Sequence, residues 1–143
     1  MDDARVAAAP DAMKGAFQTV RRMLGGLNDS QMVKFEAGNE IVPGIKSVAA
    51  YGHTPGHTLF MVESKGEKFA YVADITNVPQ LFARNPDWAV QFDMNAEEAR
   101  VARRKVFDMI VNDKVMAGGF HFPFPAFGRV EKLGNGFEFK PVA

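Results

Sequence analysis

The sequence predicts an α/β chain in which helices cover one face of a mixed, mainly antiparallel sheet. Residues 10–24 and 95–112 carry apolar side chains at steps of three and four, the period of an amphipathic helix. Residues 58–73 form two apolar runs separated by a connection with one glycine, which predicts a β-hairpin. A second hairpin is predicted within residues 128–139, around Gly134-Asn135-Gly136.

The ends of both predicted helices carry recognisable signals. Pro10 suits a first helical turn, and Gly25-Gly26 suits the end of the same helix. Asn95 is an N-cap residue for the second helix, with Glu98 as its partner in a capping box. The buried stripe of that helix is predicted to comprise Ala99, Ala102, Val106, Met109 and Ile110.

Shorter segments complete the predicted sheet. Strands are expected at residues 32–35, 45–50 and 114–117. Turns are expected at residues 37–39 and 43–44, where glycine follows or precedes other turn-forming residues. The 143 residues suit one domain that spans positions 1–143.

Composition excludes several classes of protein. Lys+Arg and Asp+Glu are both 17, so no excess positive charge favours nucleic acid, and Arg100, Arg103, Arg104 and Lys105 are interpreted as a solvated helix face. The absence of cysteine excludes disulfides and thiolate metal ligands. No apolar run is long enough to span a membrane, and the first residues lack the features of a signal peptide. We expect a soluble protein, cytoplasmic by default, with the periplasm as the alternative if the native amino terminus lies upstream.

Three separate segments each end an apolar run with a group that can bind a metal. These groups are His57, Asp74 and His121, and imidazole and carboxylate are ligands that zinc and similar divalent metals accept. Structural roles are the alternative, because loop histidines often form hydrogen bonds and an aspartate after a strand often caps a turn. The residues alone leave both readings open.

The sequence around these residues resembles that of the metallo-β-lactamase-fold hydrolases. Three motifs in order carry the resemblance: Gly52-His53-Thr54-Pro55-Gly56-His57-Thr58, Val72-Ala73-Asp74-Ile75 and Gly119-Phe120-His121-Phe122-Pro123-Phe124-Pro125. Two flanking segments look like the branch of methyl parathion hydrolase-type enzymes: Asn85-Pro86-Asp87-Trp88 and Phe92-Asp93. The resemblance covers essentially the whole chain.

The resemblance implies a two-metal hydrolase built on an αββα sandwich, with zinc or another divalent metal such as manganese. Metal-bound hydroxide would attack an ester, lactone or organophosphate bond of a small-molecule substrate. His57 would bind the first metal, Asp74 would bridge both, and His121 would bind the second; His53 would be a supporting or structural residue. Trp88 and four phenylalanines near His121, Phe122 and Phe124 among them, suit an apolar pocket wall, or equally a core or buried interface.

The sequence departs from the family in one large respect. It has three histidines, all accounted for above, so the family's H-x-H-x-D-H motif is absent. The chain therefore looks like the carboxyl-terminal half of the fold, with two ligands at each metal position where catalytic zinc normally has three. We expect weak or no metal binding and little or no hydrolase turnover from the isolated chain. The alternative is a non-catalytic binding or assembly module that keeps the fold without metals; a regulator of another class has no support in the sequence.

Half a sandwich should also leave one sheet face uncovered. Leu59 and Met61, or Phe69 and Tyr71, should line that face, because side chains alternate along a strand. Large apolar patches are rarely exposed on soluble monomers. We therefore expect the face to be covered by a second copy in a homodimer or by a missing amino-terminal half.

Overall fold

The computed structural model describes residues 3–142, and its contacts divide the chain into two compact units, Met1–Phe35 and Glu36–Ala143. The first unit contains α1 (Asp3–Ala8), α2 (Asp11–Leu24) and the short 3-10 helix η1 (Asp29–Gln31). Helix α2 confirms the helix predicted over residues 10–24, whereas α1 was missed. The single domain predicted over positions 1–143 stays a prediction.

The strand predicted at residues 32–35 is wrong. These residues follow η1 and belong to no strand. Val33 is 84% exposed, so its apolar character does not reflect burial in a sheet. A segment of four residues is too short for periodicity to distinguish a strand from a connecting segment.

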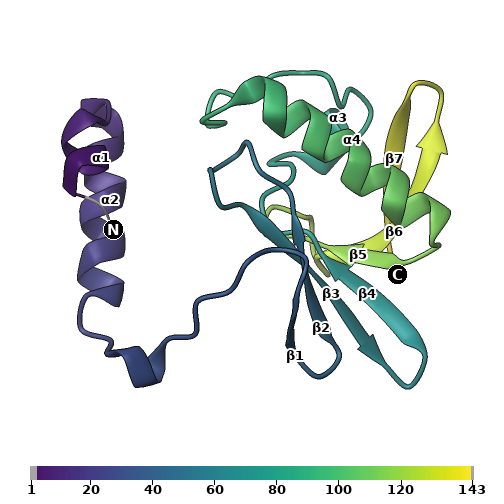
Figure 1. Cartoon of the computed structure of the whole chain (residues 1–143). Helices are drawn as coiled ribbons and strands as arrows, with labels where there is room; N and C mark the ends of the chain where they lie inside the picture. Colours follow the sequence, from purple (N-terminus) through teal and green to yellow (C-terminus); the bar gives the residue numbers. More distant parts are fainter. Residues whose placement is uncertain (1–2, 143) are drawn as a thin grey trace. The chain divides into compact units, whose positions relative to one another are not determined.

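The second unit is built on one seven-stranded sheet with its strands in chain order (Figure 1). All neighbouring strands are antiparallel except β4 and β5, which are parallel and joined through the helical segment. This confirms the mixed, mainly antiparallel sheet. The strands are β1 (Glu40–Val42), β2 (Ile45–Ala49), β3 (Thr58–Ser64), β4 (Glu67–Tyr71), β5 (Met116–Gly118), β6 (Phe127–Leu133) and β7 (Gly136–Pro141).

The two predicted hairpins are confirmed, with a correction to the turn of the first. Strands β3 and β4 remain paired as far as Ser64 and Glu67, so their loop has two residues and not the expected four. The loop residues Lys65 and Gly66 both have positive φ, 52° and 82°. Positive φ at both positions is typical of a type I′ turn, whose twist matches that of the paired strands. Strand β4 ends at Tyr71, two residues before the expected end at residue 73.

Helix α4 (Ala96–Asn112) begins against the histidine loop. The Asn95 side chain accepts a hydrogen bond from the Glu98 backbone N–H at 3.2 Å, which confirms the predicted N-cap. The Asn95 backbone N–H donates to the Gly52 carbonyl at 2.9 Å, so the return bond of a capping box is replaced by a contact between elements. Gly52 has φ +122°, and a Cβ there would lie 2.1 Å from the Ala99 nitrogen. Only glycine permits this close approach.

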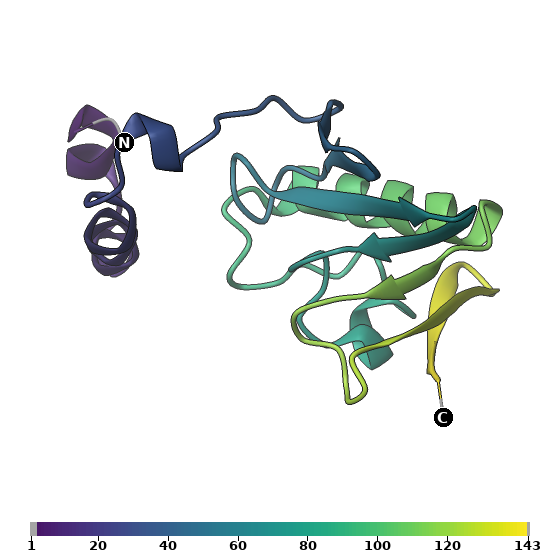
Figure 2. The ribbon, with the colours of Figure 1, turned by 90° about the horizontal axis from the view of Figure 1, so that it is seen from below.

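One face of the sheet packs against α4 and forms the core. Seen from below, the strands lie in front of α4 (Figure 2). The covered face includes Leu59 and Ala70, which pack with Val106, Phe107 and Ile110 of the helix. The short helix α3 (Pro79–Phe82), which was not predicted, lies beside β7, where the Phe137 N–H donates to the Ala83 carbonyl. No helix in residues 3–142 is long and apolar enough to cross a membrane.

The opposite face of the sheet is also apolar. Strand register places Ile45, Val62, Phe69 and Met116 side by side across β2, β3, β4 and β5. Tyr71 lies on the same face and is exposed. Of the two alternating sets that we considered, Leu59 and Met61 therefore face the helix, and Phe69 and Tyr71 form the face turned away from it.

Candidate functional site

The three predicted metal-ligating residues meet at one edge of the sheet. His57 immediately precedes β3, and Asp74 and His121 lie three residues beyond the ends of β4 and β5. The His121 Nε2 atom is 3.0 Å from Asp74 Oδ1. The Asp74 backbone N–H donates to His57 Nε2 at 3.1 Å. Asp74 therefore contacts both His57 and His121. We call these three residues the edge cluster.

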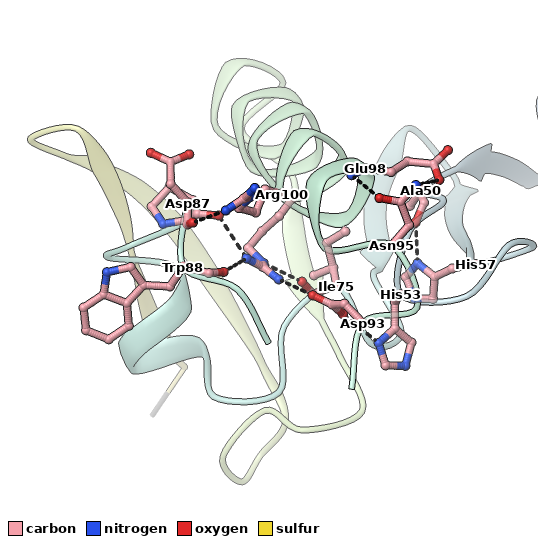
Figure 3. Close-up of polar contacts among 12 residues, drawn as sticks. Ala50, His53, His57, Ile75, Asp87, Trp88, Asp93, Asn95, Glu98 and Arg100 are labelled. Atoms are coloured by element: carbon pink, nitrogen blue, oxygen red, sulfur yellow. Dashed lines mark hydrogen bonds and ion pairs between the residues drawn. The ribbon is translucent and has the colours of Figure 1, made fainter. Parts of the chain in front are cut away.

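The His57 ring is held in one tautomer by two backbone groups. Its Nδ1 lies 2.8 Å from the Ala50 carbonyl oxygen, which can only accept, so Nδ1 carries the proton (Figure 3). Its Nε2 must then accept the Asp74 N–H. Burial lowers the pKa of His57 below its usual 6.5, with the hydrogen bond to Ala50 acting in the opposite direction. A neutral imidazole with Nδ1–H on a carbonyl is the usual form of a metal-binding histidine.

A pocket of about 340 Å³ opens at the edge cluster. Asp74 and His121 line it, together with His53 from the loop before β3. His57 is buried and does not line the pocket. His53, which the resemblance treats as a supporting or structural residue, is therefore the histidine of this loop that reaches the open space.

Arg103 anchors the wall of this pocket, and the expectation that it lies on a solvated helix face is wrong. Its side chain is 1% exposed. Its Nε donates to the Ile75 carbonyl, and one terminal nitrogen donates to the carbonyls of Pro86 and Trp88, each at 2.9 Å. Its other terminal nitrogen donates to Asp93 Oδ2 at 3.3 Å. The guanidinium thus ties three parts of the connection before α4 to the helix.

The aromatic residues predicted as a pocket wall lie elsewhere. Phe122 is buried against Phe139, with ring centroids 4.5 Å apart. Phe124 is 96% exposed, and Trp88 is half exposed with its ring edge-on to Phe82. None of the three lines the pocket, whereas the exposed Phe92, which was noted as part of a flanking motif but not predicted to line a pocket, does.

The side chains of the edge cluster are of the types that bind metal ions, but there are too few of them to complete a metal centre. Imidazole nitrogen and carboxylate oxygen suit zinc and related divalent ions. Within residues 3–142, however, no group of three or more His, Cys, Asp or Glu side chains is arranged to hold a metal ion. The described residues alone therefore do not make a complete metal centre.

Comparison with solved structures identifies the class of this fold. No family model and no curated protein sequence matches the chain. Among solved structures, AidC, a dizinc quorum-quenching lactonase, is 25% identical with a TM-score of 0.82 over 95% of this chain and 46% of its own. AbOPH, a hydrolase in the beta lactamase superfamily, is 21% identical with a TM-score of 0.88 over 100% of this chain and 51% of its own. A probable metal-dependent hydrolase from Staphylococcus aureus is 21% identical with a TM-score of 0.61 over 80% of this chain.

These similarities define a class of fold. The chain has the fold of one half of a metallo-β-lactamase superfamily hydrolase, with one mainly antiparallel sheet and its covering helices. It spans about half the length of AidC and of AbOPH. The expected half-sandwich fold is confirmed.

Proposed function

We propose that this chain is the carboxyl-terminal portion of a metal-dependent hydrolase that cleaves ester, lactone or organophosphate bonds in small molecules. The edge cluster carries this proposal, because it brings two imidazoles and a carboxylate together at one sheet edge in a chain with half the hydrolase fold. His57, Asp74 and His121 would supply part of the ligand set of a zinc centre, or of a centre with another divalent metal such as manganese. The missing ligands would come from the other half of the fold.

The residues of this chain would prepare the centre and not complete it. A bound metal would supply Lewis acidity and activate water. His57 contributes a neutral, pre-oriented imidazole, because Ala50 fixes its tautomer. The side chains of Asp74 and His121 remain about one-third and nearly half exposed, which leaves them accessible to a partner segment or a substrate. Since each metal position has two ligands here, we propose that the isolated chain turns over little or no substrate.

A hydrolysis assay tests this proposal. The isolated chain, supplied with zinc or manganese, should not hydrolyse ester, lactone or organophosphate substrates above background. A hybrid of this chain with the half of AbOPH that has no counterpart here should do so, and His57→Ala should abolish the gain. Turnover by the isolated chain that His57→Ala removes would mean that its site is already complete. A folded hybrid without turnover would count against the hydrolase assignment.

The open sheet face supports a second element of the proposal, the need for a partner. Ile45, Val62, Phe69 and Met116 form an apolar row that a second sheet could cover. A second copy in a homodimer, or the other half of the sandwich, would provide that sheet. Sedimentation at micromolar concentration should show a dimer, and Val62→Lys should dissociate it. A wild-type monomer would contradict pairing between copies.

One observation favours a second candidate, a binding or assembly module without metals. Both ring nitrogens of His57 are already bonded to backbone groups, and His121 is paired with Asp74. Hydrogen bonds alone could therefore maintain the edge cluster. Zinc content near zero in both the isolated chain and a folded hybrid would favour this module over the hydrolase.

A further inference from the structure

The His53 imidazole is fixed at the pocket by a carboxylate from a distant segment. Its Nδ1 lies 3.0 Å from Asp93 Oδ1, although the two residues are 40 positions apart. Figure 3 shows one ring nitrogen turned toward Asp93 and the other turned away from it. Within residues 3–142, the second nitrogen, Nε2, forms no hydrogen bond. The ring also packs edge-on against His57, with centroids 5.6 Å apart, so it is held in orientation as well as in position.

The carboxylate that holds His53 is itself immobilised. The Asp93 side chain is 3% exposed, and its second oxygen accepts a hydrogen bond from the buried Arg103 guanidinium. Arg103 is fixed in turn by three backbone carbonyls. Because the Asp93 carboxylate accepts hydrogen bonds, His53 Nδ1 donates the proton between them. The Nε2 atom then carries a lone pair directed away from Asp93.

Two further polar atoms at the pocket lack partners. Thr76 Oγ1 and Asn77 Oδ1 are buried, and neither has a hydrogen-bond partner within the described part of the chain. Both residues line the same pocket as His53, and Thr76 is 1% exposed. Buried polar atoms are rarely left without a hydrogen bond in native proteins. Both atoms are therefore free to bond to water or a ligand: Asn77 Oδ1 as an acceptor, and the Thr76 hydroxyl as a donor or an acceptor.

The pocket wall combines hydrogen-bond acceptors with apolar side chains. The acceptors are His53 Nε2, Asn77 Oδ1 and the Asp74 carboxylate, and the Thr76 hydroxyl can serve as one too. Val90 and Phe92 supply apolar surface to the same space. A complementary ligand therefore carries an N–H or O–H donor next to an apolar group.

We propose that His53 contacts the ligand of this pocket as a hydrogen-bond acceptor, and that the pocket selects molecules that bear an N–H or O–H donor beside an apolar group. Asp93 and Arg103 are positioning residues that act through His53. The inference rests on the proposed function in treating the pocket as the substrate site. The test of this inference requires neither metal nor turnover. The inference can therefore fail while the hydrolase assignment stands, and the hydrolase assignment can fail while the inference stands.

The first part of the test reads the His53 tautomer by NMR in the full chain labelled with ¹⁵N-histidine, at a fixed pH of about 7.5, above the ordinary pKa of histidine. We expect a protonated Nδ1 and an unprotonated Nε2. Asp93→Asn should change these signals, whereas Asp87→Asn should not. Asp87 is the matched control, because it pairs with Arg104, the neighbour of Arg103, on the outer surface. A wild-type Nε2 that carries the proton would overturn the proposal.

The second part compares two probes of nearly equal shape, benzamide and methyl benzoate. Benzamide should shift the His53 Nε2 signal in a saturable manner, and methyl benzoate should bind at least about tenfold more weakly, the effect of one well-placed hydrogen bond. His53→Leu should remove this difference. Equal binding of the two probes by the wild-type chain would overturn the proposal. An Nε2 signal that benzamide leaves unchanged would also overturn it, and would mean that the buried atoms bond to water only. The wild-type comparison suffices even if a variant does not fold.

Discussion

Arg103 and Arg104 are neighbours on α4, and each pairs with an aspartate of the connection before the helix, yet the two pairs lie in different environments. The side chains of Arg103 and Asp93 are 1% and 3% exposed. Those of Arg104 and Asp87 are 35% and 66% exposed. The same residue types thus form a buried pair beside the pocket and a solvated pair one residue further along.

The pKa shifts reflect this difference. Desolvation lowers the pKa of Arg103, and the charge of Asp93 opposes that change. The hydrogen bond with Asp87 raises the pKa of Arg104, and the same bond lowers the pKa of Asp87. A buried charge must satisfy nearly all of its donors, as Arg103 does, whereas solvent can replace the partner of an exposed charge. We infer that the buried pair organises the site and that the exposed pair contributes little.

The largest expected effect is the loss of the buried guanidinium. Arg103→Met should lower the free energy of unfolding by about 3–5 kcal/mol, because it leaves Asp93 buried without its cation and three carbonyls without a donor. Arg104→Met should change it little. Urea denaturation followed by circular dichroism measures both. Equal losses would show that burial does not distinguish the two pairs.

Replacement of the buried carboxylate should cost less. Asp93→Asn should lower the free energy of unfolding by about 1.5–3 kcal/mol, because the amide keeps an acceptor but loses the charge that Arg103 requires. A double-mutant cycle with Arg103→Met should show strong coupling between the two positions. The cycle of Asp87→Asn with Arg104→Met should show little, and strong coupling there would contradict the comparison.

Burial should also give His57 a signature in the pH dependence of stability. Its folded-state pKa is below 6.5, so the unfolded chain binds a proton more readily than the folded chain. Its contribution to stability is therefore complete above pH 6.5 and is lost as the pH falls through the lowered folded-state pKa. His57→Gln should flatten the dependence of the unfolding free energy between about pH 7.5 and 5.5. An unchanged slope in the variant would contradict the assignment.

The smallest expected effect is on salt sensitivity. Sodium chloride at about 1 M screens charges beyond roughly 3 Å in solvent and acts weakly on buried pairs. The coupling between Asp87 and Arg104 should therefore decrease with added salt, while that between Asp93 and Arg103 should not. Double-mutant cycles repeated at low and high salt make the measurement. The opposite pattern would contradict the description of the Asp93–Arg103 pair as buried and of the Asp87–Arg104 pair as exposed.

Much of the sheet and the main helix could be predicted from the sequence, because their signals are local. The β3–β4 hairpin and the Asn95 cap depend on residues within a few positions of each other. The short elements β1 and α3 have too few residues for periodicity to reveal them. Arg103 shows a further limit, because it was grouped with its charged neighbours. Its spacing of four from both Ala99 and Phe107 placed it on the buried stripe, and that signal could have identified it.

The candidate site was predictable to a similar extent. The meeting of Asp74 and His121 followed from the ends of two strands that the motifs marked. The position of His53 at the pocket did not follow, because it depends on Asp93, which lies in a different connection. The unpartnered oxygens of Thr76 and Asn77 are visible only when the chain has folded around them.

The most direct test of the central claim is the number of zinc ions held per chain, measured by elemental mass spectrometry after equilibration with zinc and gel filtration. The claim is that His57, Asp74 and His121 form part of a metal centre that this chain cannot complete. The isolated chain should retain well below one zinc ion, and the hybrid with the complementary half of AbOPH should retain up to about two, falling in Asp74→Ala. Two zinc ions held tightly by the isolated chain, or none by a folded hybrid, would contradict the account.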